Sequence, residues 1–130
     1  MQGFSKTGKR FGGRIMKILI CGTQTRKGVY EYRGQVWDWL DKNLSEGDFV
    51  IEGCCEKSAD AYAEEWIRGT KKKLMIKHFP ATKGNYLKRN IDMVESCDKV
   101  VAFWNGFSYG TAHTIAQAVL RKKPVEVILL

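Results

Sequence analysis

The stretch DKVVAFWNGFSYGTAHTI, Asp98 to Ile115, joins an apolar run to a second structured segment through a short polar junction. Asp98 to Trp104, which ends in the apolar run VVAFW, is predicted to be a strand. The segment from Thr111 to Arg121 is predicted to be a helix. A strand that passes through a short loop into a helix is the repeating unit of an α/β fold.

The same unit recurs along the chain on both sides of this stretch. Further strands are predicted at Met16 to Gly22, Phe49 to Gly53, Lys73 to Pro80 and Pro124 to Leu130, and further helices at Val29 to Leu44, Ala59 to Gly69 and Tyr86 to Ser96. Strict alternation with short connections predicts an α/β, Rossmann-like three-layer fold, in which helices cover both faces of a mainly parallel five-stranded sheet.

The chain has 130 residues, of which 44% are hydrophobic and 28% charged, and this is typical of one globular domain. Residues 1–15 are basic and contain no acid, so we expect a disordered tail ahead of a single domain at 16–130. No apolar run approaches the ~20 residues of a membrane span. The tail also lacks the apolar segment of a secretory signal. These features predict a cytoplasmic protein without a membrane partner.

Cysteine spacing and net charge limit which metal sites, disulfides and partners the chain could have. The four cysteines (Cys21, Cys54, Cys55 and Cys97) form no CxxC pair, so we expect reduced thiols, with neither a zinc site nor a disulfide framework, and no metal or cofactor. The net charge of +8 raises the alternative of a polyanion partner. However, the basic clusters at 71–73 and 121–123 fall where helices should end, and the helix dipole explains cations there.

Ligands of open α/β sheets bind beyond the carboxyl ends of the strands, so the loops that follow the strands hold the candidate residues. After the first strand, Gly22 permits a sharp turn, Thr23 offers a hydroxyl and Arg26 offers a fork of donors for phosphate. The glycine spacing matches neither a GxGxxG nor a Walker motif. A plain turn with an exposed arginine is the alternative.

Two further candidate groups follow the second and third strands. The Glu52 carboxylate, next to Gly53, is the best candidate for holding both hydroxyls of a ribose, whereas Asp60 has the position of a first-turn acid favoured by the helix dipole. Arg89 and Asn90 interrupt an otherwise amphipathic helix. A solvated helix face is the alternative for these two.

The junction of Asp98 to Ile115 is the last candidate. Gly110 and Thr111 present backbone N–H groups at a helix start, which is a ready anion site, unless Ser108 merely caps its own helix. The candidate set is completed by Trp104, Gly106, Tyr109 and His113. Trp104 or Tyr109 offers a surface for a base, with core packing as the alternative for Trp104. His113 lies too far around the helix from Ser108 for a Ser-His dyad.

In combination, CGTQTR, EG followed by AD, FPA followed by RNIDM, and CDKVVAFWNGFSYGTAHTI resemble the YspA-like branch of the SLOG superfamily. The match covers nearly all of Met16 to Leu130. This superfamily includes the Lonely Guy phosphoribohydrolases, the DNA-processing protein DprA and nucleotide-sensing domains of prokaryotic immunity. The resemblance implies a Rossmann-like fold that binds nucleotides or their derivatives, and it favours ligand binding by Gly22, Arg26, Glu52, Arg89, Asn90, Ser108, Gly110 and Thr111.

The chain departs from this family in two places. Cys54, Cys55 and Ser58 stand where the second loop is usually richer in glycine, which narrows the room for a close backbone approach. Phosphoribohydrolases also carry RKxxM and GGxGTxxE motifs with a catalytic arginine and glutamate. Here Arg89 is present, but Thr114 stands at the spacing of the glutamate, and threonine is no acid or base at neutral pH.

We therefore predict non-catalytic binding of a nucleotide-derived ligand, such as ADP-ribose or a cyclic nucleotide. One form would be a phage-encoded sponge that sequesters an immune signal in the host cytoplasm. One alternative is an N-glycosidic hydrolase of nucleoside monophosphates that uses Glu52 and Arg89; another is nucleic-acid binding as in DprA. Exposed aromatics at Tyr30 and Trp37 predict a homodimer or larger homo-oligomer.

Overall fold

The structure is a computed structural model, and it describes residues 15–25, 31–53, 55 and 57–130. Within these ranges strands and helices alternate: β1 (Lys17–Gly22), α1 (Arg33–Asn43), β2 (Phe49–Glu52), α2 (Ala59–Gly69), β3 (Met75–His78), α3 (Tyr86–Ser96), β4 (Lys99–Trp104), α4 (Tyr109–Leu120) and β5 (Val125–Leu129). Residues 1–14 of the predicted 1–15 tail, together with Arg26, Tyr30 and Cys54, lie outside the described residues.

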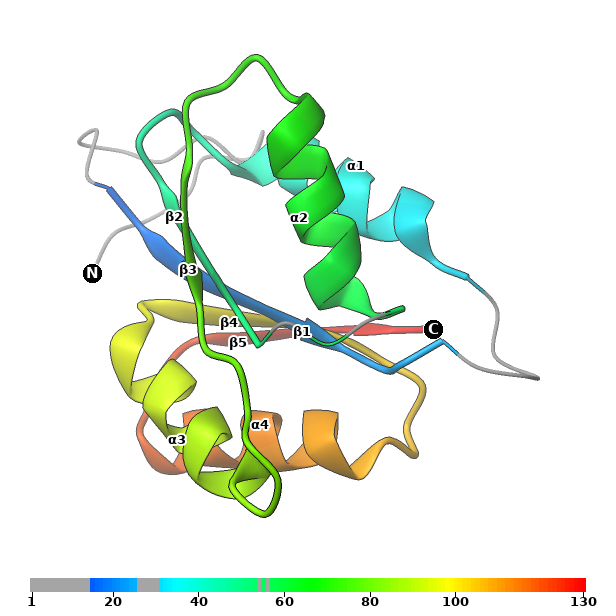
Figure 1. The fold of residues 1–130 in the computed structure, drawn as a ribbon, viewed down its shortest axis with the longest axis vertical. Helices are drawn as coiled ribbons and strands as arrows, with labels where there is room; N and C mark the ends of the chain where they lie inside the picture. Colours follow the sequence, from blue (N-terminus) through cyan, green and yellow to red (C-terminus); the bar gives the residue numbers. More distant parts are fainter. Residues whose placement is uncertain (1–14, 26–30, 54, 56) are drawn as a thin grey trace.

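The strands form one parallel sheet in the order β3-β2-β1-β4-β5 (Figure 1). The predicted fold class is therefore confirmed. From β1 the chain first builds outward through β2 and β3, and it then returns to place β4 on the other side of β1. The winding direction changes between β1 and β4, which is where open α/β sheets leave a crevice for ligands.

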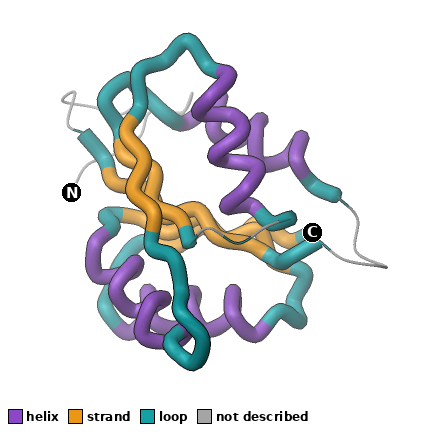
Figure 2. The backbone as a smooth tube through the Cα atoms, in the orientation of Figure 1, coloured by secondary structure: helices purple, strands orange, loops and turns teal. Residues whose placement is uncertain are grey.

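Helices cover both faces of the sheet, so the molecule has three layers (Figures 1 and 2). Helices α1 and α2 pack on one face through Val36, Leu40 and Trp66, against strand residues such as Ile18 and Val50. Helices α3 and α4 pack on the other face, where the core includes Leu19, Ile51, Met93, Val94 and Ala118. Neighbouring strand residues such as Val50 and Ile51 belong to opposite cores, because successive side chains of a strand point to opposite faces.

The element boundaries differ from the predicted ones by two residues or more in three places and elsewhere by one residue at most. Helix α4 starts at Tyr109, two residues earlier than predicted, and α1 starts at Arg33, whereas the predicted start at Val29 lies outside the described residues. Strand β3 is shorter than predicted and mostly exposed, because it forms an edge of the sheet.

The two basic clusters lie in the turns that follow α2 and α4, as predicted. Their lysines reach the carboxyl ends of neighbouring helices rather than of their own. Lys72 Nζ donates to the carbonyl oxygen of Leu44 (3.0 Å) at the end of α1, and Lys123 Nζ donates to that of Cys97 (2.7 Å) at the end of α3. A cation at a helix C-terminus stabilises the helix, so these charges have a structural explanation.

Among the described helices, none is both long and apolar enough to cross a lipid bilayer. Cys21, Cys55 and Cys97 are free thiols. Burial raises the pKa of the Cys97 thiol to about 11 and raises the pKa values of Cys21 and Cys55 as well, so these sulfurs are poor nucleophiles at neutral pH.

Candidate ligand pocket at the carboxyl ends of the strands

A pocket of about 360 Å³ lies where β1 ends and where α2 and α4 begin, and α3 forms one of its walls. Its lining residues come from four segments of the chain: Cys21, Gly22 and Gln24; Cys55 and Asp60; Tyr86, Arg89, Asn90 and Met93; and Ser108, Tyr109, Gly110, Thr111 and Thr114. Of the predicted ligand residues, the structure thus brings together Gly22, Arg89, Asn90, Ser108, Tyr109, Gly110 and Thr111.

The start of α4 faces this pocket without a side-chain cap. Ser108 occupies the N-cap position, but its side chain accepts no hydrogen bond from the helix backbone, and its Oγ lies 3.3 Å from Thr111 Oγ1. The preceding loop is ordered instead by Asn105, whose Oδ1 accepts from the backbone N–H groups of Phe107 and Ser108. The alternative that Ser108 merely caps its own helix is wrong. The positive end of the helix is left available to an anion.

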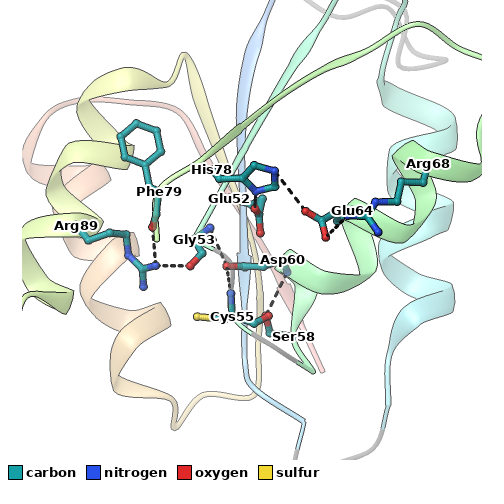
Figure 3. A network of polar contacts seen from close by, with 10 residues as sticks. All are labelled: Glu52, Gly53, Cys55, Ser58, Asp60, Glu64, Arg68, His78, Phe79 and Arg89. Atoms are coloured by element: carbon teal, nitrogen blue, oxygen red, sulfur yellow. Dashed lines mark hydrogen bonds and ion pairs between the residues drawn. The ribbon is translucent and has the colours of Figure 1, made fainter. Parts of the chain in front are cut away.

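Arg89 is held rigidly in the pocket wall rather than on a solvated helix face (Figure 3). Its Nη1 donates to the carbonyl oxygens of Gly53 (2.6 Å) and Phe79 (3.0 Å), and its Nε donates to Asn90 Oδ1 (3.1 Å). These contacts attach α3 to the residues that follow β2 and β3. They place a permanent positive charge at the carboxyl end of the sheet, since an arginine stays protonated in proteins.

Asp60 is the carboxylate of the pocket, although its sequence position predicts only a first-turn acid. The residue is 4% exposed, and its Oδ2 accepts from the N–H groups of Gly53 (2.9 Å) and Cys55 (3.3 Å). Burial, and secondarily the nearby charge of Glu52, raises the pKa of Asp60 to about 7. Asp60 therefore exists in both protonation states near neutral pH.

Glu52 does not line the pocket, in contrast to the prediction from the sequence. Its side chain is 2% exposed and contacts His78 Nδ1, while His78 Nε2 lies 3.4 Å from Glu64 Oε1 (Figure 3). The reason is the alternation of side chains along β2. Glu52 shares a sheet face with Val50, on the side of α1 and α2, whereas the pocket opens toward Cys21 and Met93 of the other core.

The remaining predicted residues support the loops around the pocket. Thr23 Oγ1 accepts from Asn105 N (3.0 Å), and Thr23 N donates to Phe103 O (2.8 Å), so this residue ties the end of β1 to that of β4. Trp104 Nε1 donates to the carbonyl oxygen of Ser108 (3.0 Å) and does not line the pocket.

Gly53, Gly106 and His113 also lie outside the lining. Gly53 supplies the backbone N–H and carbonyl that bind Asp60 and Arg89. Gly106 adopts a φ of 86° that favours glycine, and His113 Nδ1 lies 3.3 Å from Asn90 Nδ2.

The lining also contains residues that are not among the predicted ligand residues, namely Cys21, Gln24, Cys55, Asp60, Tyr86, Met93 and Thr114. For two of them, Tyr86 and Met93, the helical spacing of the sequence was a signal. One helix face follows the spacing i, i+3, i+4, i+7, which here gives Tyr86, Arg89, Asn90 and Met93. The predicted pair Arg89 and Asn90 therefore indicated that Tyr86 and Met93 lie on the same face.

No protein-family model matches the chain. No curated protein matches it either. A solved structure of the molybdenum cofactor carrier protein from Chlamydomonas reinhardtii is similar, with a TM-score of 0.52 and 16% identity over 88% of this chain and 76% of that one. At this identity the similarity supports the Rossmann-like fold alone. The assignment to the YspA-like branch stays a prediction.

Proposed function

We propose that the pocket binds a nucleotide-derived small molecule through a phosphate and a sugar. The observation that carries this proposal is the presence, in one pocket, of an uncapped helix start, a fixed guanidinium and a buried carboxylate. The first two groups suit a phosphate. Asp60 suits the hydroxyl groups of a ribose, and it takes over the role that the sequence analysis gave to Glu52.

The dimensions and the charge of the protein agree with this assignment. A volume of about 360 Å³ falls within the range of small-ligand sites. The net charge of +8 attracts anionic ligands from solution. Tyr109, which is 91% exposed at the pocket, offers a ring face to a base. The structural neighbour described above is itself named as the carrier of a small molecule.

Binding without turnover is the form of this function that we favour. Thr114 is buried, and its Oγ1 donates to the carbonyl oxygen of Gly110 (3.1 Å), so it offers the pocket no acid or base. ADP-ribose and cyclic nucleotides both contain the phosphate and sugar that the pocket suits. A phage protein that sequesters such a signal in the host cytoplasm would need nothing beyond this affinity.

One observation favours hydrolysis of an N-glycosidic bond as a second candidate function. Asp60 lies in the pocket with a pKa near 7, the range in which a carboxyl group can both donate and accept a proton during catalysis. Release of free base from a nucleoside monophosphate, abolished by Asp60→Asn, would establish this activity. Binding that persists without any release of base would exclude it.

The binding proposal is tested by denaturing the purified protein, identifying released small molecules by mass spectrometry, and measuring thermal stabilisation by ADP-ribose, cyclic nucleotides and nucleoside monophosphates. Arg89→Ala should weaken binding roughly 10- to 100-fold, because a charge-assisted hydrogen bond contributes about 1.5–3 kcal/mol. Lys88→Ala is the matched control, since Lys88 is the preceding residue of α3 and pairs with Asp92 on its surface.

Stabilisation by none of these ligands would contradict the proposal, as would equal effects of the two substitutions. Affinity for DNA that falls steeply with salt would favour the DprA-like alternative instead.

A further inference from the structure

We propose that Glu52, Glu64 and His78 form a binding site for a divalent transition metal ion, separate from the pocket. Each residue offers one donor atom, and these three atoms all lie within 4.8 Å of one another. The cysteine spacing predicts no zinc site, and this cluster contains no cysteine. The cluster is formed by residues that are distant in sequence, so no local spacing pattern indicates it.

The fold itself brings the three side chains together. Glu52 and His78 are paired residues at the carboxyl ends of the adjacent strands β2 and β3. Glu64 reaches them from α2, which packs on the same face of the sheet (Figure 3). Because two regular strands and a regular helix supply the donors, their mutual positions are set by the sheet register and not by a mobile loop.

The three donor residues are buried to different degrees, so a bound ion could still exchange with solvent. The Glu52 carboxylate is nearly inaccessible, whereas the imidazole of His78 is 42% exposed at the edge of the sheet. Glu64 is intermediate, with its Oε2 3.2 Å from Arg68 Nη2, so that its Oε1 is directed toward His78. An ion would enter past His78 and would keep one or more water ligands on that side.

The donor set suits zinc or a similar ion better than magnesium. One imidazole nitrogen with two carboxylate oxygens is a mixture that Zn²⁺ accepts, and donors around a tetrahedral Zn²⁺ lie roughly 3.4 Å apart. The His78 Nε2 to Glu64 Oε1 distance is 3.4 Å, and all three donor atoms lie within 4.8 Å of one another, so a small shift of the Glu52 and His78 side chains would be needed to bring them around one ion. Magnesium prefers oxygen ligands in octahedral geometry.

An ion at this site would also act on the neighbouring pocket. Gly53 follows Glu52 directly, and its N–H and carbonyl groups bind Asp60 and Arg89. Fixing Glu52 would therefore fix the end of β2 that positions both pocket residues. The ion would be a structural one, because none of its three donor residues lines the pocket.

The test is titration of the metal-free full chain with Zn²⁺ by calorimetry, with Mg²⁺ as the comparison ion. We expect one Zn²⁺ per chain at micromolar or tighter affinity, at least tenfold weaker binding in both His78→Ala and Glu64→Gln, and much weaker binding of Mg²⁺. Glu65→Gln is the matched control, since Glu65 is the next residue of α2 and pairs with Arg33 instead.

Cobalt(II) serves as a spectroscopic probe of the same site. Bound Co²⁺ should give d–d absorption without the charge-transfer band of a thiolate ligand. The proposal is overturned if Zn²⁺ does not bind, if His78→Ala binds it as tightly as the unsubstituted chain, or if a thiolate band places the ion on a cysteine. These outcomes leave the nucleotide-binding test above unaffected, because that test reads stabilisation by nucleotides and not binding of a metal ion.

Discussion

Arg89 occupies the space that a side chain at position 53 would need. The Nη1 atom of Arg89 is 2.6 Å from the carbonyl oxygen of Gly53 and 2.3 Å from the point where a β-carbon on that residue would lie. The distance to that point is far shorter than a van der Waals contact. The guanidinium of Arg89 can therefore take this position only because residue 53 is glycine. Gly53, which does not line the pocket, thus limits where the pocket residue Arg89 can lie.

Gly53→Ala should therefore displace Arg89 and weaken phosphate-containing ligands roughly tenfold, since about 1.4 kcal/mol corresponds to that factor. The measurement is the dissociation constant for a ligand identified in the stabilisation screen, together with the melting temperature. Gly34→Ala is the control, because a β-carbon there meets nothing within 4 Å. That substitution lies within α1 and should stabilise the protein by about 0.5–1 kcal/mol. An unchanged affinity in Gly53→Ala would contradict this role of the glycine.

Asp60 should make the stability of the protein fall as the pH rises from about 4 to 7. Its pKa is raised from 3.8 to about 7, so in this range the folded state holds a proton that the unfolded state has already released. Full ionisation above pH 7 costs on the order of 4 kcal/mol. Asp60→Asn should remove this slope and should be more stable than the unsubstituted chain at pH 8. Urea unfolding at several pH values measures the effect, with the surface substitution Asp92→Asn as the control.

Tyr32→Phe should destabilise the site scaffold by about 1–3 kcal/mol, because it leaves two buried polar groups without a partner. The Tyr32 hydroxyl donates to the carbonyl oxygen of Thr23 and accepts from Ala59 N (2.8 Å), so it joins the end of β1 to the start of α2. Tyr109→Phe, at a nearly fully exposed position, should have little effect on the free energy of unfolding. Equal destabilisation by the two substitutions would contradict the importance of this contact.

If the chain forms the homo-oligomer that the sequence predicts, we expect the edge strand β5, and not the surface with Trp37, to make the contact. Trp37 is partly engaged through its Nε1, which donates to the carbonyl oxygen of Tyr62 (2.8 Å). Leu129 is 69% exposed on the edge strand β5, on the same strand face as Val127. Leu129→Lys should give monomers in light scattering, whereas Met75→Lys on the opposite edge strand should not. A monomeric unsubstituted chain would refute the oligomer prediction.

The sequence was sufficient to predict the fold because each strand is a short apolar run with a helix signal after it. Asp98 to Trp104 illustrates this, since the predicted strand contains the whole of β4. The general position of the site also followed, because parallel strands place their carboxyl ends at one edge.

The presence of Asp60 in the pocket, and the absence of Glu52 from its lining, could not be predicted in the same way. They depend on which face of β2 the carboxylate lies on and on how the turn into α2 folds back toward Gly53. The rigid position of Arg89 likewise depends on a carbonyl 36 residues away in sequence. No local pattern encodes a contact of that kind.

The alternation along β2 has a consequence for how the gene can change. Glu52 and Gly53 are one peptide bond apart, yet they serve opposite sides of the sheet. An insertion of one residue within β2 would move the bulky acid to the place where only a bare backbone fits, and a deletion would move Gly53 to the place of Glu52. A change in the length of this strand should therefore damage the pocket more than a substitution along it.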